Sequence, residues 1–191
     1  MGFRFLNENG DFRWDQPAWL NELYFPLCNE AGALSCVSPL WHGDLKSSQD
    51  RFLLQPVSIE DLQASRAARN FWVHVEGRGG WSLTGNSAAQ LARRQLGGER
   101  RSVEAGPLWH RLRLEDPAWG LAAEISSFCP ELPWAAEVSL VSLENRGPEP
   151  LRLAPTAVTP LYARSAEHLR DHRHVTALVQ RAWRIPEGLL C

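Results

Sequence analysis

A strict alternation of apolar and polar residues in the middle of the chain constrains the fold more than any other feature. In residues 108–115, every second position belongs to the set Leu108, His110, Leu112 and Leu114, and the positions between them are aromatic or charged. Successive side chains of a β-strand point to opposite faces of the sheet, so a period of two is typical of a half-buried strand. The pattern therefore predicts a sheet with one face on a core and one face on solvent.

Further stretches show the same strand pattern. Residues 121–126 alternate in the same way and end before Cys129-Pro130. Residues 136–158 contain two apolar runs separated by Asn, Gly and Pro, which predicts a hairpin. Residues 51–58 and 70–85 add strands, the latter split by a glycine-rich turn at 77–80. Most of the chain is thus predicted to be short β-strands.

Helix signals are sparse. Ser58 followed by Asp61 resembles a capping box, which predicts a short helix over residues 59–70. Residues 87–98 contain helix-forming residues and end in two glycines, but a strand forced by tertiary context is equally open. The sequence as a whole predicts one all-β domain of two packed antiparallel sheets with one or two short helices.

Composition excludes several classes of protein. The formal net charge of the 191 residues is −2, and the basic residues are dispersed, so no nucleic-acid-binding face is predicted. No stretch approaches the roughly 18 apolar residues of a membrane span, and the start of the chain lacks the apolar region of a signal peptide. We therefore expect a cytoplasmic protein that does not bind membranes.

The cysteines predict neither zinc nor disulfides. The four cysteines form no close-set CxxC pair, which a zinc ribbon requires. In a chain without a signal peptide, buried free thiols are the better interpretation. No cofactor is expected.

Nine tryptophans are an unusual number for this length. An indole buries a large area and keeps one N–H donor, so it suits both a β-core and a platform on which a sugar ring stacks. A sugar platform would require Trp72, Trp81 or Trp109 at the surface beside an open groove.

Three histidines fall within residues 166–180, at His168, His172 and His174. Imidazoles at 172 and 174 share one face of an extended chain, which some metal sites use, and Asp171 could orient them. The interspersed arginines would repel a cation and favour an anion or a hydroxyl-rich ligand. A metal site, a polar ligand contact and a solvated turn all stay open.

No catalytic constellation is evident. The sequence has no nucleophile elbow, phosphate-binding loop, dinucleotide-binding glycine motif or zinc-protease motif. Glycoside hydrolysis requires two carboxyl groups that flank the bond, and the acidic residues are scattered with nothing to mark a pair.

Five stretches, taken in order, carry a family resemblance. They are residues 23–44, 52–62, 69–90, 103–112 and 155–181, and the last of them, PTAVTPLYARSAEHLRDHRHVTALVQR, is the most specific. Together they resemble the N-terminal β-sandwich of cellobiose phosphorylase-type inverting glycoside phosphorylases (glycoside hydrolase family 94 and relatives). The resemblance covers most of the chain.

The resemblance implies a "supersandwich" of antiparallel strands, similar to the galactose mutarotase fold. It also implies a separate catalytic helical barrel, which carries the single acid that these phosphate-using enzymes need. We expect residues 1–191 to be one β-sandwich domain, truncated at its C-terminal end, with the barrel absent. The parent enzyme would act on β-linked glucosides and inorganic phosphate, and the chain alone would be inactive.

In this family the sandwich also pairs with a second subunit, so a homodimer is expected. The segment that resembles the family most closely would lie near the sugar cleft or the surface between domains. It would bind sugar hydroxyls, phosphate or the neighbouring domain, without transferring protons. The predicted substrate-binding residues are Arg164, Arg170, Asp171, His172, Arg173 and His174.

Two alternatives come from other classes of protein. The nine tryptophans also suit a free-standing carbohydrate-binding module. A small metalloprotein that uses His168, His172 and His174 is the less favoured alternative.

Overall fold

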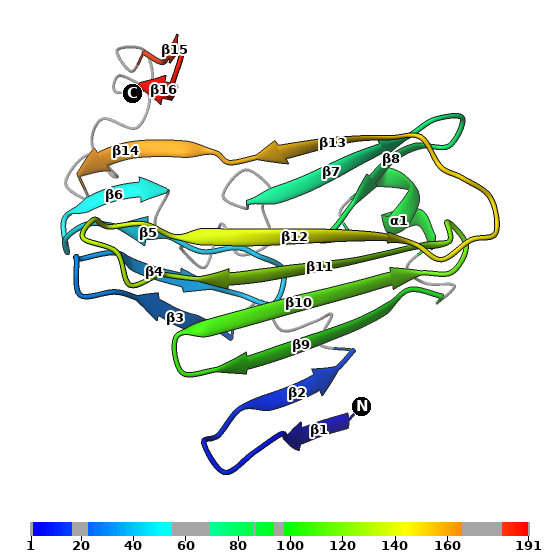
Figure 1. The fold of residues 1–191 in the computed structure, drawn as a ribbon, viewed down its shortest axis with the longest axis horizontal. Coiled ribbons are helices and arrows are strands. Elements are labelled where there is room, and N and C mark those ends of the chain that lie inside the picture. Colours follow the sequence, from blue (N-terminus) through cyan, green and yellow to red (C-terminus); the bar gives the residue numbers. More distant parts are fainter. Residues whose placement is uncertain are drawn as a thin grey trace.

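The computed structural model describes residues 2–16, 23–54, 69–85, 87–93, 98–165 and 181–190. These residues are nearly all β, with antiparallel pairing throughout, and the predicted all-β sandwich is confirmed. Two layers make up the fold (Figure 1). The larger layer is a six-stranded sheet in the order β1-β2-β9-β10-β11-β12. Its strands are β1 (Gly2–Phe5), β2 (Phe12–Asp15), β9 (Arg100–Gly106), β10 (Trp109–Asp116), β11 (Leu121–Phe128) and β12 (Val138–Asn145).

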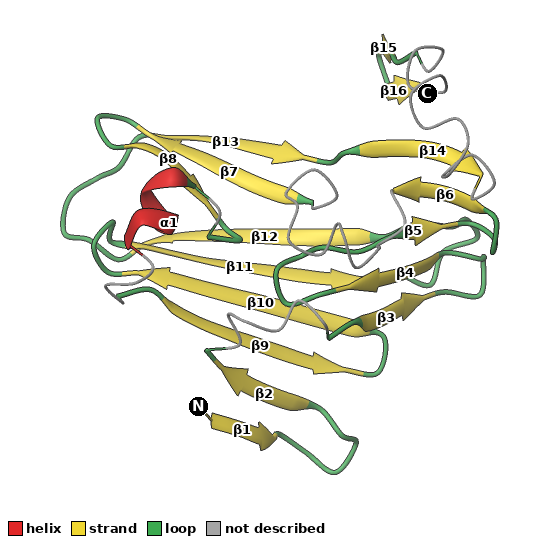
Figure 2. Ribbon diagram, turned by 180° about the vertical axis from the view of Figure 1, so that it is seen from behind, coloured by secondary structure: helices red, strands yellow, loops and turns green. Residues whose placement is uncertain are grey.

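The opposite layer is built from two smaller sheets, seen from behind in Figure 2. A five-stranded sheet has the order β14-β6-β5-β4-β3, and a three-stranded sheet has the order β13-β7-β8. The strands of the first are β3 (Phe25–Cys28), β4 (Leu34–Val37), β5 (Leu45–Lys46), β6 (Arg51–Leu54) and β14 (Leu161–Ser165). Those of the second are β7 (Asn70–Val75), β8 (Gly79–Ser82) and β13 (Leu153–Val158).

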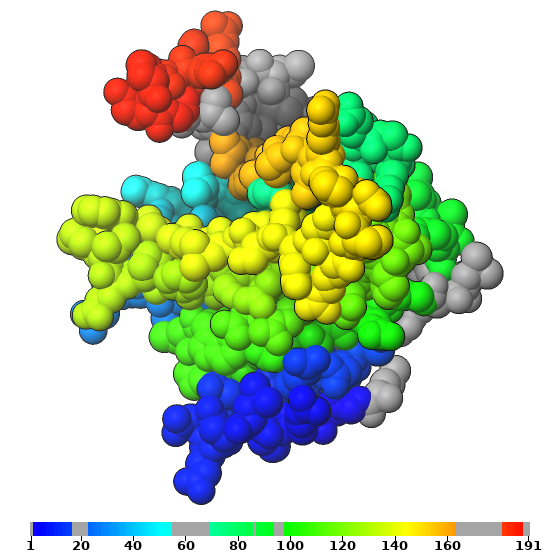
Figure 3. Space-filling model, turned by 45° about the vertical axis from the view of Figure 1, so that its right-hand side comes forward, coloured from blue at the N-terminus to red at the C-terminus, as the bar shows by residue number. Residues whose placement is uncertain are grey.

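A two-stranded ribbon of β15 (Trp183–Ile185) and β16 (Gly188–Leu190) lies near the C-terminal end of the chain. Figure 3 shows it at one end of the molecule in red, and the N-terminal hairpin at the other end in blue. The strands β9 to β12, coloured green to yellow, occupy the face between them.

The core lies between the two layers, as the alternating pattern predicts. His110, Leu112 and Leu114 are buried on the inner face of β10, and Leu121 and Ile125 are buried on that of β11. They pack against apolar residues of β3, β4, β7 and β8, among them Leu27, Val37, Val73, Val75 and Trp81. Leu108 departs from the pattern, because it lies in the turn before β10 and is 45% exposed.

The predicted hairpin over residues 136–158 is wrong. β12 pairs with β11 in the larger sheet, whereas β13 pairs with β7 in the opposite layer. The chain crosses between the layers in residues 146–152, and the backbone of Glu76 donates to the carbonyl of Arg152 at 3.1 Å. This crossing lets Val141 and Leu153 pack on the core from opposite sides, whereas a hairpin would place both strands in one sheet.

The open question over residues 87–98 resolves as a short helix, α1 (Ala88–Arg93). Ser87 caps it, because its Oγ accepts from the backbone N–H of Gln90 at 3.1 Å. The Gln90 amide also bonds both the N–H and the carbonyl of Ser82, at 2.8 and 2.9 Å, and so ties the helix to β8. The helix predicted over 59–70 falls almost wholly outside the described residues, and Asn70 begins β7.

Candidate functional site

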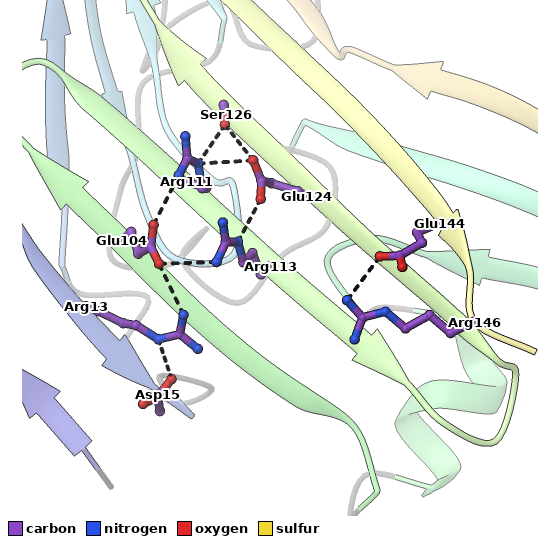
Figure 4. Close-up of polar contacts among 9 residues, drawn as sticks. All are labelled: Arg13, Asp15, Glu104, Arg111, Arg113, Glu124, Ser126, Glu144 and Arg146. Atoms are coloured by element: carbon purple, nitrogen blue, oxygen red, sulfur yellow. Dashed lines mark hydrogen bonds and ion pairs between the residues drawn. The ribbon is translucent and has the colours of Figure 1, made fainter.

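The outer face of the six-stranded sheet carries a network of arginines and carboxylates, shown in Figure 4. Because side chains alternate, the residues between the core positions of β2, β9, β10 and β11 all point away from the core. The strand register then places opposite charges side by side, with Arg13 opposite Glu104 and Glu104 opposite Arg111. In the next row, Arg113 lies opposite Glu124. We call this set Arg13, Asp15, Glu104, Arg111, Arg113 and Glu124 the charged ladder.

Glu104 is the centre of the charged ladder. Its carboxylate accepts from Arg13 Nη1 at 3.2 Å, from Arg111 Nη1 at 3.2 Å and from Arg113 Nη1 at 3.3 Å. Its side chain is only 11% exposed, although it lies on the outer face, because the three guanidinium groups cover it. Charge-assisted hydrogen bonds of this kind are stronger than neutral ones and hold the planar groups in place.

The other carboxylates extend the network in both directions. Glu124 accepts from Arg113 Nε at 2.7 Å and lies 3.1 Å from Arg111 Nε. At the β2 end, Asp15 accepts from Arg13 Nε at 2.9 Å. That hydrogen bond raises the pKa of Arg13, against a smaller opposing effect of burial. The ladder is therefore a continuous chain of alternating charges across four strands.

A second cluster lies on the same face near the ends of β10 and β12. Arg146 contacts Glu115 at 3.1 Å and Glu144 at 3.0 Å. The hydrogen bond to Glu144 raises the pKa of Arg146, and the nearby negative charges add to that effect. Both clusters border one shallow hollow of about 710 Å³, which five arginines and four carboxylates line.

A smaller hollow of about 360 Å³ adjoins the first one and shares Glu124 and Ser142 with it. Trp109, Phe128 and Leu140 contribute apolar surface to it. The guanidinium of Arg111 lies 5.6 Å from the ring centroid of Trp109, within the range of a cation–π contact. The outer face thus combines an aromatic group with a polar network, in hollows of the size that ligand sites have.

The structure leaves most of the predicted substrate-binding residues untested. Arg164 lies in β14, where its backbone pairs with Phe52 of β6 beside a register shift. Arg170, Asp171, His172, Arg173 and His174 lie outside the described residues, as does His168. Whether these residues form one site therefore stays a prediction.

Two of the three tryptophans considered as sugar platforms reach the surface in part. Trp72 and Trp109 are half-buried. Trp81 is fully buried, and its Nε1 donates to Asp116 Oδ2 at 3.3 Å. Trp81 is therefore a core residue, which leaves Trp109 as the tryptophan next to the charged ladder.

The described cysteines, Cys28, Cys36 and Cys129, are free thiols as predicted, but they are half-buried where full burial was predicted. Burial raises the pKa of Cys36 and of Cys129 to about 11, so both stay protonated near neutral pH. Among the described residues, no group of three or more His, Cys, Asp and Glu side chains is placed to hold a metal ion. The described part of the chain also contains no helix that is long and apolar enough to cross a membrane.

A third feature is a buried ion pair inside the sandwich. Arg69 Nη2 donates to Glu137 Oε2 at 2.7 Å, and the side chains are 5% and 6% exposed. Arg69 also donates to the carbonyls of Gly43 and Asp44 at 3.3 and 3.2 Å, and Ser35 Oγ hydrogen-bonds Glu137. These partners satisfy the two charges, as burial in a low-dielectric interior requires.

Comparison with known proteins adds no family. No protein-family model matches the chain, and no curated protein matches it. What defines its class is the structure itself, an all-β sandwich with a charged, hollowed outer face.

Proposed function

We propose that the chain is a non-catalytic carbohydrate-binding and scaffolding β-sandwich domain, and that the sugar lies on the charged ladder. The observation that supports this most is the hollow of about 710 Å³, lined by paired arginines and carboxylates, next to Trp109. The reasons concern charge, hydrogen bonding and apolar surface.

The balance of charge favours an uncharged ligand. Five arginines and four carboxylates line the hollow, and ion pairs neutralise most of them. A polyanion such as nucleic acid would require an excess of unpaired cations. A polyol binds instead through many neutral hydrogen bonds to groups that are already held in place.

The ladder offers these hydrogen bonds in a fixed geometry. A guanidinium carries five N–H donors and a carboxylate accepts about four hydrogen bonds, so each keeps spare capacity after pairing. Arg113, for example, uses Nε and Nη1 for Glu124 and Glu104. Adjacent hydroxyls of a sugar match such planar, two-point groups.

The apolar part of the site is the smaller hollow. A pyranose ring has an apolar C–H face, and Trp109 with Phe128 and Leu140 offers apolar surface beside the polar network. Leu140 is 58% exposed, so its apolar surface is open to a ligand.

The family resemblance leads us to propose the wider role as well. In that role the domain walls the sugar cleft of a glycoside phosphorylase that acts on β-linked glucosides and inorganic phosphate, and it contacts a second subunit. Incubation of the chain with cellobiose and phosphate is expected to give no glucose 1-phosphate. Formation of that product at enzyme-like rates would contradict the non-catalytic role.

Titration calorimetry with cellobiose and cellotetraose tests the binding site. We expect saturable binding that Glu104→Gln and Trp109→Ala each weaken by about tenfold or more, which corresponds to about 1.4 kcal/mol. Arg152→Ala is the matched control, because Arg152 is 86% exposed, pairs among the described residues with Glu76 at 3.6 Å, and directly precedes β13 of the opposite layer. Equal binding by all four proteins would remove the ladder as the site.

A further inference from the structure

One edge of the six-stranded sheet is formed by β1, and no strand of the described residues pairs with the outer side of β1. Figure 1 shows β1 as the outermost strand of its layer. An edge strand of this kind presents backbone N–H and C=O groups to which another strand can bind. The edge is therefore able to pair with a further strand.

The hydrogen-bond pattern shows which backbone groups of β1 are free. Leu6 N donates to Asp11 O at 2.7 Å, at the turn end of the hairpin of β1 and β2. Residues of an antiparallel pair alternate between hydrogen-bonded and non-hydrogen-bonded positions, so the even-numbered residues of β1 also bond to β2. The N–H and C=O groups of Phe3 and Phe5 therefore point to the open side.

The inner face of β1 exposes aromatic side chains. Phe5 lies opposite Phe12 of β2, and Phe12 lies opposite the buried Ala105 of β9, so this face is the one toward the core. Phe12 still meets the opposite layer, because its ring centroid lies 5.8 Å from that of Phe25 in β3. Phe3 shares this face, and Phe3 and Phe5 are 54% and 67% exposed. The sheet therefore extends past its cover with an apolar face open to solvent.

The outer face of β1 carries an arginine without a carboxylate partner. Arg4 lies opposite Arg13, and like charges directly opposite on adjacent strands are destabilising. Arg13 is paired with Asp15 and Glu104, whereas Arg4 makes no ion pair with any described residue. The Asp15 side chain is 37% exposed, and its Oδ2 lies 3.6 Å from the place that a Cβ of Gly2 would occupy. A carboxylate near Arg4 and a cation near Asp15 would therefore complement this edge.

A second copy of β1 supplies both charges. If two β1 strands pair antiparallel about a two-fold axis at Phe3, the outward backbone groups of the two Phe3 residues bond to each other and Gly2 faces Arg4 of the second copy. Glycine has no side chain, so this arginine extends past it toward Asp15, whose backbone is two strand spacings away, roughly 10 Å. An axis at Arg4 would instead put two arginines face to face, so charge favours the axis at Phe3.

We propose that two copies of the chain pair through their β1 strands and join their six-stranded sheets across a two-fold axis, with Arg4 of each copy bonded to Asp15 of the other. The two exposed Phe3 rings then pack side by side on the inner face. The same residues contribute from both copies, as a two-fold interface requires. The inference rests on the second-subunit contact of the proposed function and specifies its surface, but the sugar site is not part of it.

Sedimentation velocity of the chain at low salt, over about 1 to 300 µM, tests the pairing. One short strand pair makes a small interface, which is typical of weak association, so we expect a shift from monomer to dimer within this range. A sedimentation coefficient that stays at the monomer value throughout would overturn the proposal.

Arg4→Asp and Asp15→Lys distinguish this interface from any other. In a pair of Arg4→Asp chains two carboxylates meet at each end of the interface, and in a pair of Asp15→Lys chains two cations meet, so each variant alone is expected to stay monomeric. An equimolar mixture forms opposite charges again at both ends and is expected to dimerise about as the wild type does. A mixture of the two folded variants that stays monomeric, or single variants that dimerise like the wild type, would overturn the proposal.

Arg152→Asp is the matched control, because it makes the same change of charge at a side chain that is 86% exposed and lies before β13. We expect it to leave dimerisation unchanged. Equal weakening by Arg152→Asp and Arg4→Asp would show that net charge, not the β1 edge, controls association, and would overturn the proposal.

Cellotetraose titration separates this inference from the sugar site. Arg4 lines neither hollow of the outer face, so Arg4→Asp is expected to bind the sugar as the wild type does while it fails to dimerise. A monomeric wild type that binds cellotetraose would contradict the β1 pairing alone, and a dimer that binds no sugar would contradict the sugar site alone.

Discussion

The charged ladder and the buried pair of Arg69 and Glu137 use the same two chemical groups in opposite surroundings. Arg13, Arg111 and Arg113 on the outer face are 27% to 42% exposed, whereas Arg69 is 5% exposed inside the sandwich. On the outer face, water and salt weaken each ion pair, so a pair forms and breaks at little cost. In the interior, each charge is stabilised by its partner, and water does not solvate the charge that is left when the partner is removed.

This difference assigns different roles to the two regions. The groups of the ladder keep spare hydrogen-bonding capacity and border open hollows, so they suit contact with a ligand. The groups of the buried pair are bonded to Ser35, to Gly43 and Asp44 carbonyls and to each other, so they hold the loop between β4 and β5 against the residues before β12. Mutations should therefore affect binding in one region and stability in the other.

The largest effect is expected from Glu137→Gln. The substitution conserves volume but leaves the Arg69 charge buried without its counter-ion, so unfolding free energy should fall by about 3–5 kcal/mol. Urea denaturation measures it. Glu76→Gln is the control, because it removes the exposed ion pair of Glu76 with Arg152, whose charged groups lie 3.6 Å apart. Its effect on the unfolding free energy should stay within about 0.5 kcal/mol. Similar losses of stability in both variants would contradict the different energetic roles of buried and exposed ion pairs.

His110 sharpens the comparison through pH. It lies on the inner face of β10, between outward-facing Trp109 and Arg111, and burial, with a smaller effect of Arg69, lowers its pKa to about 3. Below its unfolded pKa near 6.5, the unfolded chain takes up a proton that the folded chain excludes. Lowering the pH from 7 to 4 should therefore reduce the free energy of unfolding by about 3 kcal/mol through His110.

His110→Phe removes this titration and keeps a ring that can stack on Phe25, whose centroid lies 5.1 Å from that of His110. Chemical denaturation at pH 7 and pH 4 should show a clearly smaller loss of stability in this variant than in the wild type. His74→Phe, at an exposed position of β7, is the control and should follow the wild type. A His110→Phe protein with the full pH dependence would show that other groups cause it.

A smaller stability effect is expected from Glu104→Gln. The variant removes the central charge of the ladder, but water reaches the three arginines and solvates them, so the loss should be about 1 kcal/mol. Thermal or urea unfolding at low and high salt measures it, and the difference from the wild type should shrink as salt rises. A loss as large as that of Glu137→Gln, independent of salt, would show that Glu104 behaves energetically like the buried Glu137.

The local pattern of residues 108–115 was enough to predict a strand and its inner face, and the strand patterns repeated along the chain predicted the fold class. It could not predict the charged ladder, because Arg111 and Arg113 look like ordinary solvated residues until the register places them against Glu104 and Glu124. Arg13 and Glu104 are 91 positions apart, so no local signal joins them.

The same limit explains the wrong hairpin. Turn formers after Asn145 show that a strand ends there, but not which sheet the next strand joins. The S-x-x-Q spacing of Ser87 and Gln90 is a capping box that could have decided the open question in favour of a helix. Trp41 shows the reverse, because a position that local turn chemistry reserves for glycine is occupied by a residue that only tertiary contacts explain.

The central claim is that the outer face of the six-stranded sheet binds an uncharged sugar beside Trp109. The most direct measurement is a titration of ¹⁵N-labelled protein with cellotetraose, which follows the indole N–H of Trp109 and the backbone signals of β10 and β11. The account predicts saturable shifts confined to these residues and to the ladder, and a sugar concentration about tenfold higher for half-saturation in Glu104→Gln. Absence of any saturable shift up to about 50 mM sugar, a range that covers even very weak binding, would contradict it.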